Sequence, residues 1–418
     1  MNEISVDIAV IGGGPAGLAA ALEAKKQGAK SVMILERDFE LGGILPQCIH
    51  DGFGIHRFGE RMAGSQYAQV FIDEVEKAGI DVRLNTMVLE VTQDKLVYAC
   101  NRDEGILKIQ AGAVILAMGC RERTAGQVLI FGYRPAGVLT AGSAQRYINI
   151  EGYLPGKKAV ILGSGDIGLI MARRMTLEGM EVAGVYEVME HPGGLTRNVV
   201  QCLEDYGIPL HLSTTVTRIH GKHNLEGVTV AKVDEQRRPI ESTEAFVECD
   251  LLVLAVGLIP ENELSLQAGV EIDPRTRGPL LDNHFMTSVP GIFAAGNVAV
   301  VFDLVDYVSE SAELAARGAM KYLRGELDEN VPYRQVACRG NVSFAVPQRI
   351  RADTKEGGET VFFLRVRHPQ QKARLQCLCE EQSLGRQTFA AVTPPEMLVI
   401  KTPGPGSGDI VLEIQEGA

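Results

Sequence analysis

The sequence predicts an α/β protein made of two related domains with parallel sheets, followed by a small β domain. Three observations lead to this fold class. A short apolar strand, a glycine-rich turn, a helix and a second strand follow one another twice, at 7–36 and at 158–187. Each copy is followed by a later apolar strand that ends in glycine, at 113–119 and at 251–257. Short strand-like runs then dominate the chain from about residue 335.

The turn in each copy has the pattern G-x-G-x-x-G. The first glycine permits a tight bend after the strand, the second lets the backbone approach a pyrophosphate, and the third lets the helix pack close to the strand. The pyrophosphate then lies at a helix N-terminus, where open N–H groups and the helix dipole favour an anion. The glycines are Gly12, Gly14 and Gly17 in the first copy and Gly163, Gly165 and Gly168 in the second. The pattern indicates two dinucleotide sites. The alternative is two ordinary βαβ units with glycine-rich turns, and this alternative is weaker for the first copy than for the second.

An acidic residue ends the second strand of each copy. Glu36 follows Gly17 by 19 residues, and Glu187 follows Gly168 by the same 19. A carboxylate in this place can accept hydrogen bonds from a ribose hydroxyl. Residues 188–191 after Glu187 include no arginine, so a nicotinamide nucleotide bound there is expected to be NAD rather than NADP.

The composition excludes several other classes of protein. The 418 residues, 45% hydrophobic and 22% charged, suffice for two or three globular domains. A net charge of −12 argues against a nucleic-acid surface. We see no signal peptide and no apolar run long enough to span a membrane, and eight scattered cysteines do not suggest a disulfide framework. The cytoplasm is therefore the expected location.

The order of these features predicts the domain boundaries. Residues 1–125 and 255–330 form one discontinuous domain, and residues 126–254 form a second domain inserted into it. The rest of the chain, 331–418, forms the β domain. Within the first domain, a buried strand in 287–297 leads into a helix at 305–325. Asp303 and Asp306 are expected to cap this helix, with hydrogen bonding to a cofactor as the alternative.

The C-terminal region contains three clear strand-like runs, at 359–369, 372–381 and 409–415, and a predicted turn at 383–385. Cys377 and Cys379 form a C-x-C motif in the middle run. They share a strand face with apolar residues and are predicted to be core residues. Since an iron–sulfur cluster needs four ligands, and no further ligands lie at the usual spacing, no metal site is predicted.

These motifs resemble the pyridine nucleotide-disulfide oxidoreductase superfamily over residues 5–325. The resemblance implies that the first glycine turn binds FAD and that the second, in the inserted domain, binds NAD(P)H. The strand ending at Gly296 and Asn297 resembles the family's second FAD motif, which usually has Asp where this chain has Asn297. Further cofactor-binding residues implied by the resemblance are Pro15, Ala16, Arg37, Gly43, Ala117 and Gly119 on the FAD side, and Asp166 and Ile167 on the NAD side. Gly257, at the end of the later apolar strand at 251–257, is a further cofactor-binding residue that the resemblance implies.

A closer resemblance rests on the segments 41–60, 134–142, 192–210 and 345–352. They are similar to the FAD/NAD-binding subunit that accompanies flavoproteins of the anaerobic glycerol-3-phosphate dehydrogenase type. Subunits of hydrogen cyanide synthase, opine oxidase and dye-linked proline dehydrogenase are more distantly similar. The resemblance implies a hetero-oligomer in which a partner flavoprotein dehydrogenase, with or without a further small redox subunit, joins this chain. The partner oxidises the substrate, and this chain passes electrons between flavin and NAD.

Cys48 and His50 are the candidate catalytic side chains. Disulfide reductases of the superfamily have a cysteine pair near this place or in the inserted domain, but here the next cysteine after Cys48 is Cys100. Because a dithiol needs two neighbouring sulfurs, disulfide reduction is disfavoured. Cys48 could alternatively cycle through sulfenic acid, or be an inert buried thiol. His50 could move protons, or stabilise a turn.

Three functions therefore remain open. The first is the NAD-linked electron-transfer subunit. The second is a self-sufficient NADH oxidase or peroxidase that uses Cys48. The third is a non-catalytic scaffold subunit whose nucleotides only hold a complex together; the intact second glycine turn and Glu187 argue against it.

Overall fold

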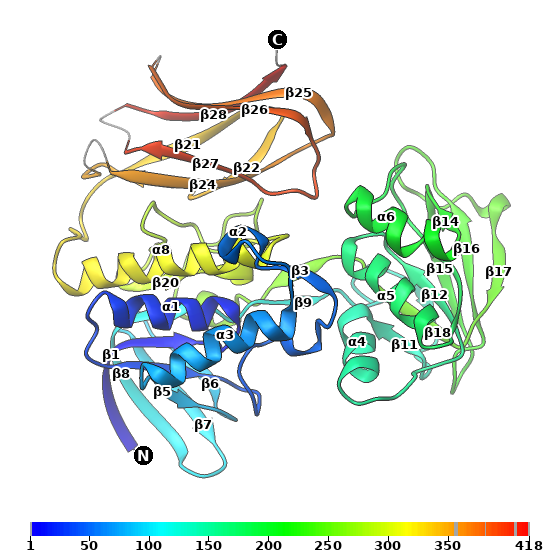
Figure 1. The fold of residues 1–418 in the computed structure, drawn as a ribbon, viewed down its shortest axis with the longest axis horizontal. Helices are drawn as coiled ribbons and strands as arrows, with labels where there is room; N and C mark the ends of the chain where they lie inside the picture. Colours follow the sequence, from blue (N-terminus) through cyan, green and yellow to red (C-terminus); the bar gives the residue numbers. More distant parts are fainter. Residues whose placement is uncertain (1, 355–357, 381, 405–407, 417–418) are drawn as a thin grey trace. The chain divides into compact units, whose positions relative to one another are not determined.

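The computed structural model describes residues 2–354, 358–380, 382–404 and 408–416. The chain forms two compact units (Figure 1). The first consists of Met1–Pro46, Asp51–Cys120 and Pro260–Ala418, and the second of Gln47–His50 and Arg121–Ile259.

The first unit contains a seven-stranded sheet in the order β5-β2-β1-β8-β7-β6, with β20 beside β8. Strands β5, β2, β1, β8 and β20 run parallel, whereas β7 is antiparallel to both of its neighbours. The bounds are β1 Asn2–Ile11, β2 Val32–Leu35, β5 Asp81–Arg83, β6 Met87–Val91, β7 Leu96–Asn101, β8 Gly105–Leu116 and β20 Ile292–Ala294. The apolar runs in β1, β2 and β8 are fully buried, as expected for a parallel sheet with both faces covered.

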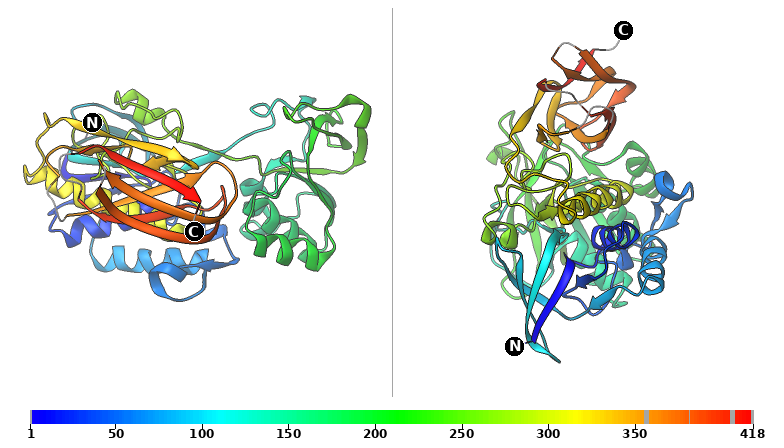
Figure 2. Two further views of the ribbon diagram at one scale, coloured as in Figure 1. Left: turned by 90° about the horizontal axis from the view of Figure 1, so that it is seen from above. Right: turned by 90° about the vertical axis from the view of Figure 1, so that its left-hand side faces the viewer.

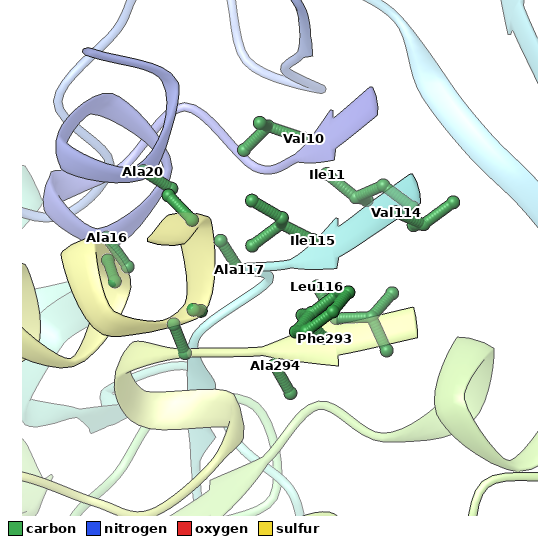
Figure 3. Packing of buried hydrophobic residues seen from close by; sticks show 14 of the residues in the cluster. Val10, Ile11, Ala16, Ala20, Val114, Ile115, Leu116, Ala117, Phe293 and Ala294 are labelled. Carbon is green, nitrogen blue, oxygen red and sulfur yellow. The ribbon is translucent and has the colours of Figure 1, made fainter. Parts of the chain in front are cut away.

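Small residues determine how helices pack beside this sheet. Helix α1 (Pro15–Lys26) packs against α8 (Val305–Leu323), and both helices bury alanines. Figure 3 shows Ala16 and Ala20 of α1 beside α8, next to the ends of β1, β8 and β20. Short side chains let two helices approach closely, which keeps the N-terminus of α1 near the strand ends. The helix predicted at 305–325 is confirmed as α8.

The second unit repeats the central arrangement of the first. Its five-stranded parallel sheet has the order β11-β18-β12-β13-β14, so β12 lies between β13 and β18 just as β1 lies between β2 and β8. A second sheet of this unit has the order β10-β15-β16-β17. The bounds are β10 Phe131–Gly132, β11 Val138–Thr140, β12 Lys158–Leu162, β13 Glu181–Tyr186, β14 Leu210–His211, β15 Thr214–His220, β16 Gly227–Lys232, β17 Ala245–Glu248, β18 Leu251–Leu254, α4 Ala141–Asn149, α5 Asp166–Leu177 and α6 Thr196–Cys202.

The C-terminal strands, orange to red in Figure 2, form two sheets around a separate apolar core. Their orders are β23-β21-β28-β25-β26 and β22-β24-β27. The bounds are β21 Tyr333–Gly340, β22 Val342–Val346, β23 Arg349–Arg351, β24 Glu359–Val366, β25 Gln370–Cys379, β26 Gln382–Val392, β27 Leu398–Pro403 and β28 Ile410–Glu416. The predicted C-terminal β structure is observed, in the same compact unit as the first sheet, and the α/β class of the chain is confirmed.

Of two predictions for the C-terminal strands, the one for the cysteines is confirmed and the one for a turn is wrong. Cys377 is buried in the core of the β domain and Cys379 packs against that core, as predicted, and burial raises the pKa of Cys377 to about 12. The turn predicted at 383–385 is wrong, because these residues lie inside β26, where Gly385 pairs with Cys377. Strand β26 is an edge strand whose residues are mostly exposed, so its sequence has no apolar alternation to reveal it.

One further long helix is α3 Gly64–Lys77. The remaining short elements are α2 Ile55–Phe58, α7 Glu263–Gln267, β3 Asp51–Phe53, β4 Met62–Ala63, β9 Cys120–Glu122 and β19 Leu258–Pro260. Within the described residues, every helix is too short or too polar to pass through a lipid bilayer.

Candidate nucleotide sites

The first glycine turn connects β1 to α1 and leaves no room for side chains at two of its glycines. Gly12 has a φ of +106°, and a Cβ there would lie 2.4 Å from the carbonyl oxygen of Ala117. A Cβ on Gly17 would lie 1.8 Å from the carbonyl oxygen of Gly12. The turn therefore packs tightly against the end of β8 and against its own helix, which explains both glycines.

The second glycine turn, between β12 and α5, has the same close contacts. Gly163 has a φ of +101°, and its Cβ would lie 2.2 Å from the carbonyl oxygen of Ala255. A Cβ on Gly168 would lie 2.4 Å from the carbonyl oxygen of Gly163. The two turns thus have equivalent geometry in the two units.

The middle glycine of each turn has a different reason to be glycine. A Cβ on Gly14 would have only the Cα of Gly43 near it, at 3.7 Å, and a Cβ on Gly165 would have nothing within 4 Å. Both residues have ordinary negative φ values, −76° and −63°. Neither packing nor backbone conformation requires glycine here, so the open space suits a ligand that approaches the backbone. No side chain caps α1 or α5, which leaves N–H groups of both first turns available to an anion.

The two glutamates bind the glycine turns of their own units in the same way. Glu36 Oε2 accepts the N–H of Gly13 at 2.5 Å, and its Oε1 accepts the N–H of Asp38 at 2.8 Å. Glu187 Oε2 accepts the N–H of Ser164 at 2.9 Å and its hydroxyl at 2.7 Å, while Oε1 accepts the N–H of Met189 at 2.9 Å. Each carboxylate is therefore fixed beside its turn, where a ribose of a bound dinucleotide would lie.

The second FAD motif contacts the first glycine turn directly. A Cβ on Gly296 would lie 2.7 Å from the Cβ of Ala16 in α1, so this glycine allows the strand end and the helix to meet. Asn297 Oδ1 accepts the N–H of Phe302 at 3.0 Å, and its Nδ2 donates to the Sγ of Cys120 at 3.6 Å. An aspartate could make the first contact but could not donate to the sulfur. The amide retains a second N–H that can serve a cofactor.

The other residues implied by the resemblance occupy several environments. Gly43 has a φ of +59° and packs on Gly14, with 3.0 Å between its Cβ position and the Cα of Gly14. Arg37 is largely exposed and pairs with Glu261 at 3.2 Å, so its guanidinium is committed to a carboxylate. Positive φ values also occur at Gly119 and Gly257, each three residues after the end of a buried strand, β8 and β18. Pro15 is the first residue of α1, and Ile167 packs on the core of the second unit.

Cys48 belongs to the second unit, where the segment Gln47–His50 is fixed on α4. Gln47 Nε2 donates to the carbonyl oxygen of Gly142 at 2.9 Å, and Asn149 Nδ2 donates to the carbonyl oxygen of Gln47 at 2.9 Å. The Cys48 thiol donates to Gln145 Oε1 at 3.8 Å. Burial raises the pKa of Cys48 to about 12, so the thiol is protonated at neutral pH. These features favour the inert buried thiol over a redox centre.

This environment predicts that Cys48 resists alkylation in the native protein. Because its pKa is raised, thiolate forms only near pH 12, whereas an unfolded cysteine ionises near pH 8.5. At pH 8, iodoacetamide should modify native Cys48 at least about a hundredfold more slowly than the same residue in urea. Mass spectrometry of peptides measures both rates, and Cys100, which is only partly buried, is the internal control. Native labelling of Cys48 with a midpoint at pH 8 or below would contradict this prediction.

The acidic residues before and in α8 do not cap it. The N-cap is Leu304, and no side chain caps the helix. Asp303 Oδ2 accepts the N–H of Met397 at 3.0 Å, and Asp306 Oδ1 accepts the N–H of Arg57 at 3.0 Å. The capping prediction is therefore wrong, because both carboxylates instead bind backbone groups from distant segments.

His50, the second candidate catalytic residue, is half-buried in the segment on α4.

Sequence reasoning missed several residues of the second site. Ser164 is fully buried. Its hydroxyl donates to Glu187 Oε2 and accepts a hydrogen bond from the N–H of Gly193 at 2.8 Å, so it links the glutamate to the loop. Gly194 lies against Asp166 and Leu169. A signal was present: a Gly-Gly pair begins six residues after the glutamate in both copies, at Gly42 and at Gly193.

One comparison with known protein families decides which family has these two glycine turns. A model of the pyridine nucleotide-disulphide oxidoreductase family matches residues 6–319. The chain belongs to this family. The family uses FAD and NAD(P), so the chain is a flavoprotein oxidoreductase with two nucleotide sites. Each glycine turn offers an open cradle and an anion-binding helix end that a dinucleotide needs.

Two curated relatives are parts of larger enzymes by name. Hydrogen cyanide synthase subunit HcnB of Pseudomonas protegens is 29% identical over 287 residues, which are 64% of this chain and 60% of that protein. An opine oxidase subunit of Agrobacterium tumefaciens is 26% identical over 340 residues, which are 76% of this chain and 66% of that protein. The chain thus spans about 60% of the length of the first relative and 66% of the second.

A solved structure supports the fold independently. Thioredoxin reductase of T. acidophilum has a TM-score of 0.61 and is 25% identical, over 76% of this chain and 98% of that one. In this chain, residues 121–201 contain no cysteine. A C-x-x-C pair is therefore absent from the part of the second unit that contains its glycine turn, although the fold is shared.

Proposed function

We propose that this chain is the NAD-linked, FAD-containing electron-transfer subunit of a hetero-oligomeric dehydrogenase. The observation that supports it most is the pair of equivalent glycine turns, each with a fixed glutamate and an open middle glycine. Two dinucleotides in one chain are what electron transfer between a nicotinamide and a flavin requires. The cofactors supply the redox chemistry when bound, and the protein supplies binding, orientation and electrostatics.

Each domain is assigned one cofactor. FAD is held by residues of 1–125 and 255–330, through the first glycine turn, Glu36, Gly43, Gly296 and Asn297. NAD is held by residues of 126–254, through the second glycine turn and Glu187. In the FAD domain, Gly296 keeps the second FAD motif against the N-terminus of α1.

NAD is preferred over NADP because Glu187 cannot move away from a 2′-phosphate. Its two oxygens accept three hydrogen bonds from the chain, and only 7% of the residue is exposed. The residues that follow, 188–191, offer no arginine or lysine to a phosphate. A 2′-phosphate would therefore meet a fixed negative charge without compensation.

A charge-removing variant tests this preference. Glu187→Gln keeps the shape of the side chain and an oxygen for the two hydrogen bonds from Ser164, but gives up the one from the N–H of Met189. It should lower the ratio of kcat/KM for NADH over NADPH by about tenfold, since one unfavourable charge pair is lost. Glu204→Gln, in an exposed residue of the same unit outside 188–191, is the control and should leave the ratio unchanged. If the ratio were unchanged in Glu187→Gln, the charge of Glu187 would not be the cause of the preference for NADH over NADPH.

The partner is proposed to be a flavoprotein dehydrogenase that acts on glycerol-3-phosphate or a similar hydroxy acid, with a further small redox subunit possible. The support is the resemblance of four segments to that subgroup and the two relatives named as enzyme subunits. The complex is expected in the cytoplasm. A tagged chain purified from its own organism should bring down a second flavoprotein, and the purified chain should reduce a dye with NADH.

The same assay separates the two other candidates. A Cys48-dependent oxidase would consume oxygen or peroxide without a partner and lose this activity in Cys48→Ser. A scaffold subunit would contain nucleotide but reduce no dye. The buried, protonated thiol of Cys48 opposes the first of these, and the open second site opposes the other.

A further inference from the structure

The loop after Glu187 repeats a feature of the first site. In both copies a Gly-Gly pair begins six residues after the glutamate. In each copy, the first glycine of this pair donates its N–H to the second residue of the glycine turn. Gly42 donates to the carbonyl oxygen of Gly13 at 2.9 Å, and Gly193 donates to Ser164 Oγ at 2.8 Å. The loop of the second copy therefore folds back over its glycine turn, as the loop of the first copy does.

Asp166 fastens the rest of this loop to α5. Its Oδ1 accepts the N–H of Leu195 at 2.9 Å and the Nδ2 of Asn198 at 2.7 Å. Gly194 lies so close that a Cβ would be 2.8 Å from the same oxygen and 2.7 Å from Leu169 Cδ1. The segment Gly193–Asn198 is thus held against the first turn of α5 before any nucleotide binds.

The charge of Asp166 stands where a pyrophosphate is expected. Asp166 is the first residue of α5, and the corresponding residue of α1 is the neutral Pro15. A carboxylate at a helix N-terminus weakens the attraction of that terminus for an anionic ligand. The weaker attraction for the anionic dinucleotide is offset if Asp166 is needed to hold the loop. It also makes the dinucleotide at the second turn easier to release than the one at the first turn.

Building on the proposed function, we infer that Asp166 is a positioning residue of the NAD site. It holds Gly193–Asn198 as a preformed wall of that site, and its charge keeps the bound nucleotide exchangeable. It acts through the loop, in place of the direct contact with the dinucleotide that the resemblance implies.

Two variants separate the loop contact from the charge. Asp166→Asn retains an oxygen that can accept both hydrogen bonds but removes the charge, so the Kd for NADH should fall by about three- to fivefold. Asp166→Ala removes the charge and both contacts, so NADH should bind at least about tenfold more weakly than in Asp166→Asn. The FAD content should be unchanged in both, because FAD is assigned to the other glycine turn. Asp205→Asn, an exposed carboxylate of the same unit, is the control for charge alone.

Hydrogen exchange of the NADH-free holoprotein provides a readout that does not depend on NADH binding. Amides of 193–198 should exchange at least about tenfold faster in Asp166→Ala than in the wild type, and Asp166→Asn should restore slow exchange. Equal exchange in all three proteins, or equal NADH affinity of the two variants, would overturn the inference. A wild type that binds no NADH, with exchange behaving as expected, would instead overturn the proposed function and leave the loop contact intact.

Discussion

Replacing Gly165 by alanine should weaken NADH binding by about tenfold or more while leaving the fold and the FAD content intact. Nothing lies within 4 Å of a Cβ at this position, and its φ of −63° suits alanine. The apo protein therefore accepts the methyl group, and stability should be unchanged or rise by about 0.5 kcal/mol because the unfolded chain loses freedom. The loss of affinity would come only from a ligand that needs the same space. Because the chain has no tryptophan to report binding, titration calorimetry with NADH measures it.

Gly126→Ala is the matched control for this variant. Gly126 lies in the same unit, is exposed, and also has no atom within 4 Å of its Cβ position. The control should show a similar small change in thermal midpoint and an unchanged Kd for NADH. If Gly165→Ala bound NADH as well as Gly126→Ala does, the second glycine turn would not be a nucleotide site.

Replacing Gly14 by alanine should produce the complementary defect, a folded protein that has lost most of its FAD. Its Cβ would have only the Cα of Gly43 near it, at 3.7 Å, an ordinary contact, and its φ is −76°. The methyl group would enter the space that a pyrophosphate needs at the N-terminus of α1, which should raise the Kd for FAD by about tenfold or more. The ratio of flavin to protein absorbance after dialysis measures the loss.

The two variants form a crossed design. Gly14→Ala should still bind NADH, and Gly165→Ala should still contain FAD, because each turn belongs to a different compact unit. A variant that lost both nucleotides would indicate damage to the fold rather than to one site. Retention of full FAD content in Gly14→Ala would remove the first turn from the FAD site.

The repeated fold could be predicted because its causes are local. Each glycine turn needs glycine at Gly12 and Gly163 for a positive φ and a close carbonyl, and such requirements are visible in a single sequence. The buried strands at 113–119 and 251–257 are continuous apolar runs, which a parallel sheet covered on both faces produces. Alanine-rich α8 was predicted with its start at Val305.

What could not be predicted depends on contacts between distant residues. Asp306 is a good capping residue by type, yet it binds the N–H of Arg57, a residue 249 positions earlier. The role of Asp166 depends on a loop that begins 27 residues later in the sequence, at Gly193. Strand β26 is exposed at a sheet edge, so its pairing with β25 leaves no periodic signal. Likewise, the burial of Cys48 results from packing on α4 and not from its neighbours in the sequence.

An anaerobic titration of the purified chain with NADH tests most directly whether electrons pass between NAD and FAD held by this one chain. The visible flavin band should bleach with about one NADH for each FAD, because the chain offers two nucleotide sites, and the next cysteine after Cys48 in the sequence is as distant as Cys100. A flavin band that stays unchanged while NADH binds would contradict the account. It would leave a chain that binds both nucleotides without exchanging electrons between them.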